Sequence, residues 1–110
     1  MYETRKGTVS INYVPVPVYC RDAGSGRADL EVLAGTTGPS YCRDRSGGGR
    51  VCFSLERMKG DFCFFPLQDE QGEIKGFELA GCGDDAMNAL IQALSFALDT
   101  LNRQCVRNPE

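Results

Sequence analysis

Six cysteines are the side chains of this 110-residue sequence with the clearest capacity for chemistry: Cys20, Cys42, Cys52, Cys63, Cys82 and Cys105. In a short exported chain, an even number of cysteines is typical of disulfides, here with fifteen possible pairings of six. In a reducing compartment the same residues act as small apolar side chains. None of the spacings matches a zinc knuckle or a Cys-x-x-Cys redox motif. We therefore predict no metal and no cofactor.

Two thiol arrangements nevertheless keep a second function open. Cys82 stands just before the start of a predicted helix, where the helix dipole favours a thiolate, so Cys82 is a candidate reactive thiol. A small packed residue at the junction of a strand and a helix would explain the same position. Cys20 and Cys42 lie in similar sequence surroundings and could converge on a metal. A thiol-based redox or metal-holding protein is the first alternative.

The chain contains no histidine. This removes the commonest proton-transfer side chain and every Ser-His or Cys-His nucleophile pair. Two pairs of adjacent carboxylates, Asp69-Glu70 and Asp84-Asp85, fit a turn and the start of a helix respectively. We therefore predict a protein without catalytic residues, which is not an enzyme.

Two related segments are rich in arginine and glycine, and they run from Tyr19 to Arg27 and from Tyr41 to Arg50. Guanidinium groups beside flexible glycine amides can hold a phosphate or a carboxylate. The Gly-Lys-Ser/Thr ending of a P-loop is absent. Anion or phosphate recognition is the second alternative, and solvated turns are the plainer interpretation. The candidate partner- or anion-binding residues are Tyr19, Arg21, Arg27, Tyr41, Arg43, Arg45 and Arg50.

Charge and hydropathy limit the partners and the compartment. The net charge of -3 makes nucleic-acid binding unlikely on electrostatic grounds. No stretch is apolar and long enough to span a bilayer, so we expect no membrane partner. The first residues lack the apolar core of a signal peptide, which favours a cytoplasmic protein, with export after signal removal as the alternative.

The first half of a single domain is predicted to hold two strands. Residues 8–19 alternate apolar and polar side chains, and the alternation changes phase near Tyr13, which predicts a bulge there. Pro15 and Pro17 cannot donate to a strand ladder, so this stretch is predicted to be an edge strand or an extended polyproline-like arm. A second strand is expected at about 28–34, with loops at 20–27 and from about 35 to Arg50.

Residues 51–81 are predicted to form a three-stranded meander. Tight turns at Lys59-Gly60 and Gln71-Gly72 set its two registers. The first places Leu55 opposite Phe64 and Phe53 opposite Pro66, and the second places Phe64 opposite Leu79 and Pro66 opposite Phe77. Both registers put one set of apolar side chains on a single face: Phe53, Leu55, Phe62, Phe64, Phe77 and Leu79.

A helix is predicted to follow the strands, with Asp85 as its N-cap and Asn108-Pro109 at its end. Its apolar residues recur at spacings of three and four, and we expect this face to cover the Phe-rich face of the sheet. The fold class is therefore α+β, with about five mostly antiparallel strands and one C-terminal amphipathic helix packed on one sheet face.

The start of this helix carries a resemblance. The segment Gly83-Asp-Asp-Ala-Met-Asn-Ala-Leu-Ile-Gln-Ala-Leu94 resembles the closing helix of a family of small uncharacterised bacterial domains, with the pattern Gly-x-Asp-Ser/Ala-x-Gln-Ala-Leu-x-x-Ala-Leu. Asn88 stands where the pattern has Gln. The resemblance implies strands followed by a capped C-terminal helix, and it implies no function.

Small acidic domains without catalytic residues and with open sheet surfaces suit inhibitors and adaptors. The function we expect is therefore that of a non-enzymatic protein-binding or accessory module, such as an immunity-like inhibitor of a protein partner. An exposed edge strand invites a protein partner. We expect the binding surface to combine residues 20–27 and 42–50 with the strand at 13–19. The oligomeric state is left open at this point.

Overall fold

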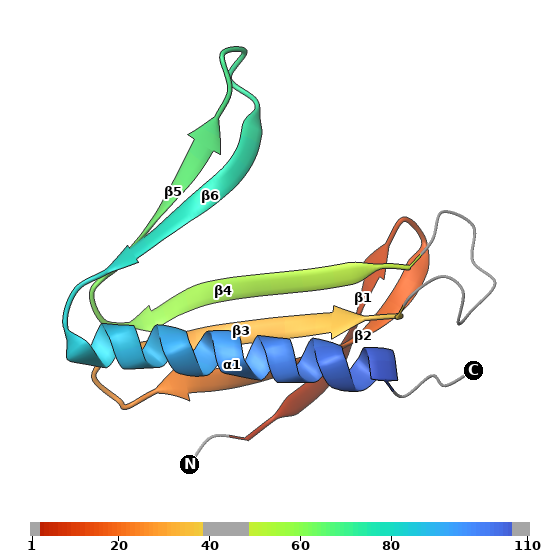
Figure 1. Ribbon diagram of the computed structural model, residues 1–110, viewed down its shortest axis with the longest axis horizontal. Helices are drawn as coiled ribbons and strands as arrows, with labels where there is room; N and C mark the ends of the chain where they lie inside the picture. The colour runs from red at the N-terminus through yellow and green to blue at the C-terminus, as the bar shows by residue number, and fades with distance from the viewer. Residues whose placement is uncertain (1–2, 39–48, 107–110) are drawn as a thin grey trace.

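The computed structural model describes residues 3–38 and 49–106, and it confirms the α+β class. Six strands, one more than expected, form two antiparallel sheets. The larger sheet has the order β1-β2-β3-β4, and the smaller sheet pairs β5 with β6 (Figure 1). A single helix, α1, follows the strands. The bounds are β1 (Arg5–Ile11), β2 (Val14–Gly24), β3 (Asp29–Thr36), β4 (Val51–Lys59), β5 (Phe62–Gln68), β6 (Ile74–Gly81) and α1 (Asp84–Val106).

A hairpin turn, not a bulge, causes the change of phase at Tyr13. Asn12 and Tyr13 have φ angles of 50° and 68°, and they join β1 to β2 with Ile11 paired to Val14. Two residues with positive φ are the mark of a type I′ hairpin, whose twist matches that of the flanking strands. The prediction of a bulge inside one long strand is therefore wrong.

The prolines of β2 do not make it an edge strand, because β2 lies between β1 and β3. Pairing with β3 begins only at Val18, so Pro15 and Pro17 lie opposite β1 residues and precede the second ladder. The carbonyl oxygen of Pro17 accepts a hydrogen bond from Nε2 of Gln104 at 3.0 Å. Pro17 is tolerated because the side of β2 on which it has no N–H to donate contacts the Gln104 side chain and makes no strand ladder there.

The second strand predicted at 28–34 is confirmed as β3. The loop predicted at 20–27 is mostly strand, because β2 continues to Gly24 and pairs with β3 from Val18 onwards. Only a short turn remains between β2 and β3.

Of the two registers predicted for the 51–81 meander, one is confirmed. Phe64 pairs with Leu79 and Pro66 with Phe77, as the second turn predicted. The first register is wrong, because Phe53 of β4 pairs with Ala34 of β3 and not with β5. The two-stranded sheet β5–β6 instead rises from the end of the larger sheet as a separate arm (Figure 1).

The root of this arm explains why β5 does not fold back onto β4. Gly60 has a φ of 107°, and a Cβ atom there would lie 2.8 Å from Cα of Ala28. Only glycine fits so close to a neighbouring backbone. The N–H of Cys82 donates to the carbonyl of Asp61 at 3.1 Å, and Phe62 is only 2% exposed. These contacts hold the first residues of the arm away from the β4 edge.

The core lies between α1 and the two central strands β2 and β3. The helix begins at Asp84, and the N–H of Met87 donates to the carbonyl of Gly83, so Asp85 lies inside the first turn and is not the N-cap. The predicted end at Asn108-Pro109 lies outside the described residues. The helix covers the Phe-rich face only in part, because Phe62 is buried with the helix alanines and Leu55 and Leu79 pack against them, while Phe53, Phe64 and Phe77 stay exposed. The alanines that face the sheet are Ala86, Ala89, Ala93 and Ala97.

The molecule is open in shape. Its radius of gyration is 15.7 Å, whereas about 13 Å is typical of a folded chain of this length. The extents of 45 × 43 × 18 Å describe a flat molecule. Helix α1 and the larger sheet form its body, and β5–β6 projects from one end of the body as the arm (Figure 1). Within residues 3–38 and 49–106, no helix has the length and hydropathy to cross a membrane.

Candidate functional site

Helix α1 carries two apolar stripes, and only one of them is buried. The small residues from Ala86 to Ala97 face the sheet and are at most 5% exposed. The second stripe is made of large side chains that are about half exposed: Met87, Ile91, Leu94 and Leu98. A helix that exposes its largest apolar residues to water is stabilised by packing against a second surface, since burying each such side chain contributes about 1.5–3 kcal/mol.

The end of the second stripe reaches the β4 side of the helix, whereas Ile91 lines a hollow on the β2 side. Leu101 and Cys105, which continue this stripe, line one hollow together with Val51 of β4. The other flank of the helix meets β2, where the ring of Phe96 lies 4.7 Å from the guanidinium carbon of Arg21. The apolar surface of α1 is therefore continuous with the β4 side of the sheet.

Strand β4 adds its own apolar residues to this surface. Val51, Phe53 and Leu55 pair with Thr36, Ala34 and Val32 of β3, so all of them share the sheet face on which α1 packs. The helix covers β2 and β3 and leaves β4 open. Val51 is 63% exposed and Phe53 is 38% exposed as a result.

The arm supplies the third part. Its face that bears Phe62 is anchored in the core at the root, where a Cβ on Gly81 would lie 3.2 Å from Cβ of Ala86. Further out on the same face, Phe64 and Phe77 are 39% and 57% exposed. A groove of about 560 Å³ runs between the arm and β4, lined by Leu55, Phe62 and Phe64 among others.

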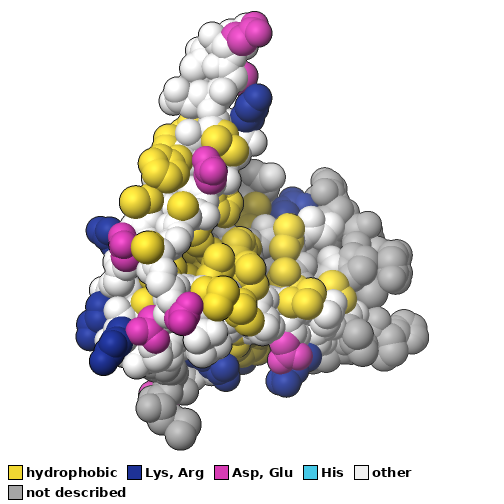
Figure 2. All heavy atoms as spheres, turned by 60° about the vertical axis from the view of Figure 1, so that its left-hand side comes forward, with side chains coloured by type: hydrophobic (Ala, Val, Ile, Leu, Met, Phe, Trp, Pro, Cys, Tyr) yellow, Lys and Arg dark blue, Asp and Glu magenta, His cyan; other side chains and the backbone are white. Residues whose placement is uncertain are grey.

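Together these side chains form one concave surface, which we call the apolar face. Figure 2 shows hydrophobic side chains gathered at the foot of the arm and over the body beside it, while the tip of the arm is mostly polar. A contiguous exposed apolar patch of this kind is typical of interaction sites. We define the apolar face by its exposed members: Val51, Phe53, Phe64, Phe77, Met87, Ile91, Leu94 and Leu98.

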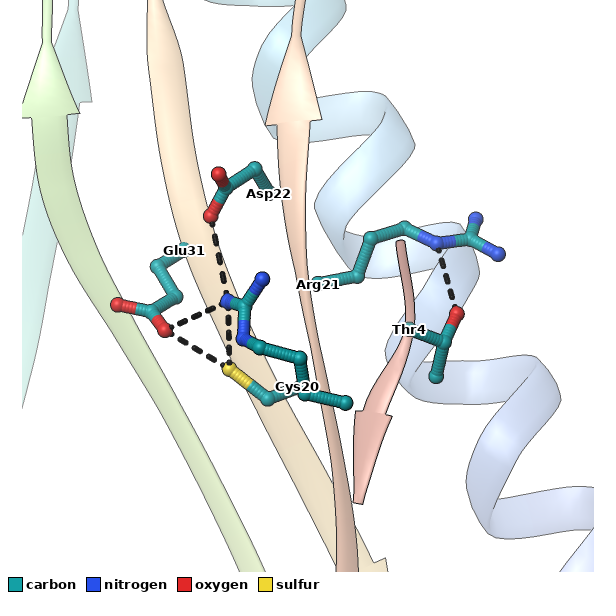
Figure 3. Close-up of polar contacts among 6 residues, drawn as sticks. Thr4, Cys20, Arg21, Asp22 and Glu31 are labelled. Atoms are coloured by element: carbon teal, nitrogen blue, oxygen red, sulfur yellow. Dashed lines mark hydrogen bonds and ion pairs between the residues drawn. The ribbon is translucent and has the colours of Figure 1, made fainter. Parts of the chain in front are cut away.

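The opposite face of the larger sheet carries a polar cluster (Figure 3). The guanidinium of Arg5 donates to Glu31 at 2.9 Å and to Asp22 at 3.4 Å. The Cys20 thiol donates to the same Glu31 oxygen at 2.9 Å. Adjacent strands place these residues side by side, since Arg5 pairs with Cys20 and Asp22 pairs with Glu31.

This cluster disfavours the thiolate form of Cys20. Partial burial and the hydrogen bond to Glu31 raise the pKa of Cys20, because the thiolate would be desolvated and would lie beside a carboxylate. The hydrogen bonds from Cys20 and Arg5 lower the pKa of Glu31. A nucleophilic or redox-active cysteine needs the opposite shift, so the surroundings of Cys20 do not favour thiol chemistry.

Tyr19 and Arg21 line a hollow of about 920 Å³ between the first strands and α1, with Phe96 and Arg103 on its helix side. Both cations in it already have partners. Arg21 stacks on Phe96 and donates to the Thr4 hydroxyl at 3.3 Å, and Arg103 pairs with Asp99 at 2.9 Å. An anion entering this hollow would compete with those contacts.

The structure does not bring the other candidate arginines to this hollow. Arg27 is exposed in the turn between β2 and β3. Arg50 lies at the opposite end of the sheet, where its Nε donates to the carbonyl of Ile11 and its N–H donates to Thr37. Tyr41, Arg43 and Arg45 lie outside the described residues.

The described cysteines form no cross-link: Cys20, Cys52, Cys63, Cys82 and Cys105 are all free thiols. Cys82 is exposed between β6 and α1, where its backbone N–H holds Asp61. Cys42 lies outside the described residues. Within the described part of the chain, no group of three or more His, Cys, Asp or Glu side chains could hold a metal ion.

The sequence-based candidates missed the apolar face, because the Phe-rich face of the strands and the apolar face of the helix are expected to cover each other. One signal could have found it. The alanines at 86, 89, 93 and 97 recur at helical spacing beside a second stripe of larger residues. A helix with both stripes has more apolar surface than one packing contact needs.

No family model matches this chain, and no curated protein or solved structure matches it.

Proposed function

We propose that this protein is a non-enzymatic protein-binding module, and that the apolar face is its binding surface. The observation that carries the proposal is the exposure of large apolar side chains from α1, β4 and β5–β6 on one concave surface. Such a surface marks an interaction site, because its exposure to water is costly without a partner. The aromatic residues Phe53, Phe64 and Phe77 would serve as anchors.

The Arg- and Gly-rich segments remain a competing surface for the same function. Arg21 and Arg50 are engaged within the protein, as their contacts with Phe96 and Ile11 show. Arg27 is exposed in the turn between β2 and β3. These observations support the apolar face over the arginines as the main source of binding energy.

The two surfaces are separated by measuring affinity for a defined partner. The tagged full-length chain is purified from its source, the stoichiometric partner is identified by mass, and that partner is then produced alone. Its Kd is measured for the wild type, Ile91→Lys, Asn88→Lys and Arg27→Ala. Asn88 is an exposed residue of α1 away from the stripe, so it controls for the added charge.

We expect Ile91→Lys to weaken binding at least about 30-fold, the effect of losing one hot spot. We expect Asn88→Lys and Arg27→Ala to change the Kd less than about threefold. Loss of binding in Arg27→Ala with full binding in Ile91→Lys would assign the function to the arginine-rich surface instead. Recovery of no stoichiometric protein partner, the chain itself included, would contradict the proposal as a whole.

A further inference from the structure

Four strand edges of the described structure have no strand partner. Strands β1 and β4 each pair on one side only, at the two borders of the larger sheet, and β5 and β6 pair only with each other. Unpaired edges offer rows of backbone N–H and C=O groups to another strand. A two-stranded hairpin is by itself only marginally stable in water. The β5–β6 arm therefore requires a surface to pack against beyond its root.

The arm cannot reach the nearest such surface in its own chain. To lie beside its own β4, β5 would have to reverse direction within residues 60–61. That backbone is packed against Ala28 at Gly60 and tied to Cys82 at Asp61. Phe62, the first residue of β5, is buried in the core. The open edge of β4 and the arm are thus held apart within one copy.

The two surfaces nevertheless match in pattern. On β4, Phe53 and Leu55 share one face, and on the arm Phe64 and Phe77 share one face. If a β5 strand added beside β4 with Phe64 opposite Leu55, the two faces would form one apolar sheet surface. Leu101 and Cys105, which continue the exposed stripe of α1, lie beside Val51 of β4 on the same side.

We propose that the apolar face is occupied by a second copy of this chain, and that the two copies exchange arms. The β5–β6 arm of each copy lies against α1 and β4 of the other, with β5 beside the open edge of β4. Two equivalent contacts then form around a twofold axis, as in most symmetric dimers. The inference rests on the proposed protein-binding function and names the partner.

The available area supports this occupant. The eight members of the apolar face are 38% to 63% exposed. At on the order of 80 Å² each, they offer most of the about 800 Å² per partner that a stable interface buries. The backbone groups and the polar rim of the arm would supply the remainder.

The first test is the mass of the full-length protein in solution, measured by light scattering during size-exclusion chromatography. We expect the wild type to have twice the 12.0 kDa of one chain. We expect Ile91→Glu/Leu98→Glu and Phe64→Lys/Phe77→Lys each to be monomeric, and the control Asn88→Glu to stay dimeric. Circular dichroism checks that both double variants keep the helix and the sheets.

Mixing the two double variants tests the exchange itself. One contact of the mixed dimer then joins an unaltered arm to an unaltered helix, and the other joins lysines on the arm to glutamates on the helix. We expect the mixture to regain the dimeric mass. Two helices packed on each other across the axis could not be rescued in this way, so a mixture that stays monomeric while both variants are folded overturns the exchange.

The outcomes separate this inference from the proposed function. A wild type that is monomeric at roughly 100 μM, far above the Kd of a stable interface, overturns the second copy as occupant. The proposed function then depends on whether Ile91→Lys weakens binding of a different protein. A dimer that Ile91→Glu/Leu98→Glu does not dissociate also overturns the inference, since the contact would lie elsewhere.

Discussion

Tyr13 is 98% exposed and has a φ of 68°, in the left-handed region that bulky residues rarely enter. Its conformation costs roughly 1 kcal/mol, because Cβ approaches the neighbouring carbonyl oxygen there. The strain persists because the two-residue turn at Asn12 and Tyr13 joins β1 to β2. Nothing else in the described structure offsets the cost of a tyrosine at this position.

Replacing Tyr13 with glycine is therefore expected to stabilise the protein. Tyr13→Gly creates the Asn-Gly pair that type I′ hairpins favour, and it should raise the free energy of unfolding by about 0.5–1 kcal/mol. Urea denaturation measures the change. Tyr13→Ala, which keeps the Cβ, is the control and should give no gain. Equal gains in both variants would show that the tyrosine side chain, not its backbone, is unfavourable.

The Cys20 thiol and Glu31 shift each other's pKa in opposite directions. The lowered pKa of Glu31 means that its contribution to stability is present above the ordinary glutamate pKa of 4.5 and is lost as the pH falls. The raised pKa of Cys20 means that this thiol holds its proton at pH values where an ordinary cysteine begins to ionise.

Cys20 should consequently react slowly with an alkylating agent at pH 8. In Glu31→Gln, the carboxylate that disfavours the thiolate is gone, so Cys20 should be alkylated several-fold faster. Peptide mass spectrometry follows the rate at each cysteine. The rate at Cys63, which lies in the other sheet, should not change, and an unchanged rate at Cys20 would mean that burial alone protects it.

Helix α1 carries its small apolar residues on one face and its large apolar residues on another. The alanine stripe lets the helix lie close to β2 and β3, and Ala89 and Ala93 have no exposed surface. Such close packing leaves no room for an added side chain. The large stripe is then free for the apolar face, which a helix with large residues on the sheet could not provide.

Ala93→Leu is expected to lower the free energy of unfolding by about 1–3 kcal/mol, because the larger side chain separates the helix from the sheet. Asn88→Leu adds the same side chain at an exposed position of α1 and should change stability by less than about 0.5 kcal/mol. Urea denaturation compares the two. A tolerated Ala93→Leu would contradict close packing at this stripe.

Local signals in the sequence predicted the elements better than their contacts. Gly72 and the alternating residues around it specify the β5–β6 register, because a hairpin depends only on its turn and the flanking strands. The partner of β4 could not be predicted in the same way. Gly60 looks like a hairpin turn, yet its packing against Ala28 involves residues more than thirty positions away in the sequence.

The apolar face could not be predicted from the sequence for a related reason. Hydrophobic periodicity identifies apolar side chains but does not say which are buried in their own chain. Ile91 and Leu98 have the same pattern as core residues, and only the placement of Ala89 and Ala93 against β3 shows that they remain outside.

The β5–β6 arm joins the larger sheet and α1 at a root formed by Gly60, Asp61 and Phe62. The larger sheet with α1 has a continuous core, to which β5–β6 contributes Phe62 and, at its border, Leu79. Regions with few buried contacts open more readily than the core. The outer part of the arm should therefore depend on whatever occupies the apolar face.

Hydrogen exchange can detect this dependence. In Ile91→Glu/Leu98→Glu, which we expect to be monomeric, amides of β5 and β6 should exchange at least about tenfold faster than in the wild type, while those of β2 and β3 keep their rates. Mass spectrometry of peptic peptides resolves the strands. Equal exchange of β5 and β6 in both proteins would show that the arm is stable by itself.

The uncovered apolar face also has a consequence for the lifetime of the chain in a cell. Exposed phenylalanines and open strand edges are the features by which proteases and chaperones distinguish incomplete proteins from finished ones. A newly made chain should accordingly be degraded quickly until another polypeptide covers Phe64 and Phe77. Its abundance would then rise more steeply than its rate of synthesis, and pulse-chase labelling at two expression levels would reveal the difference.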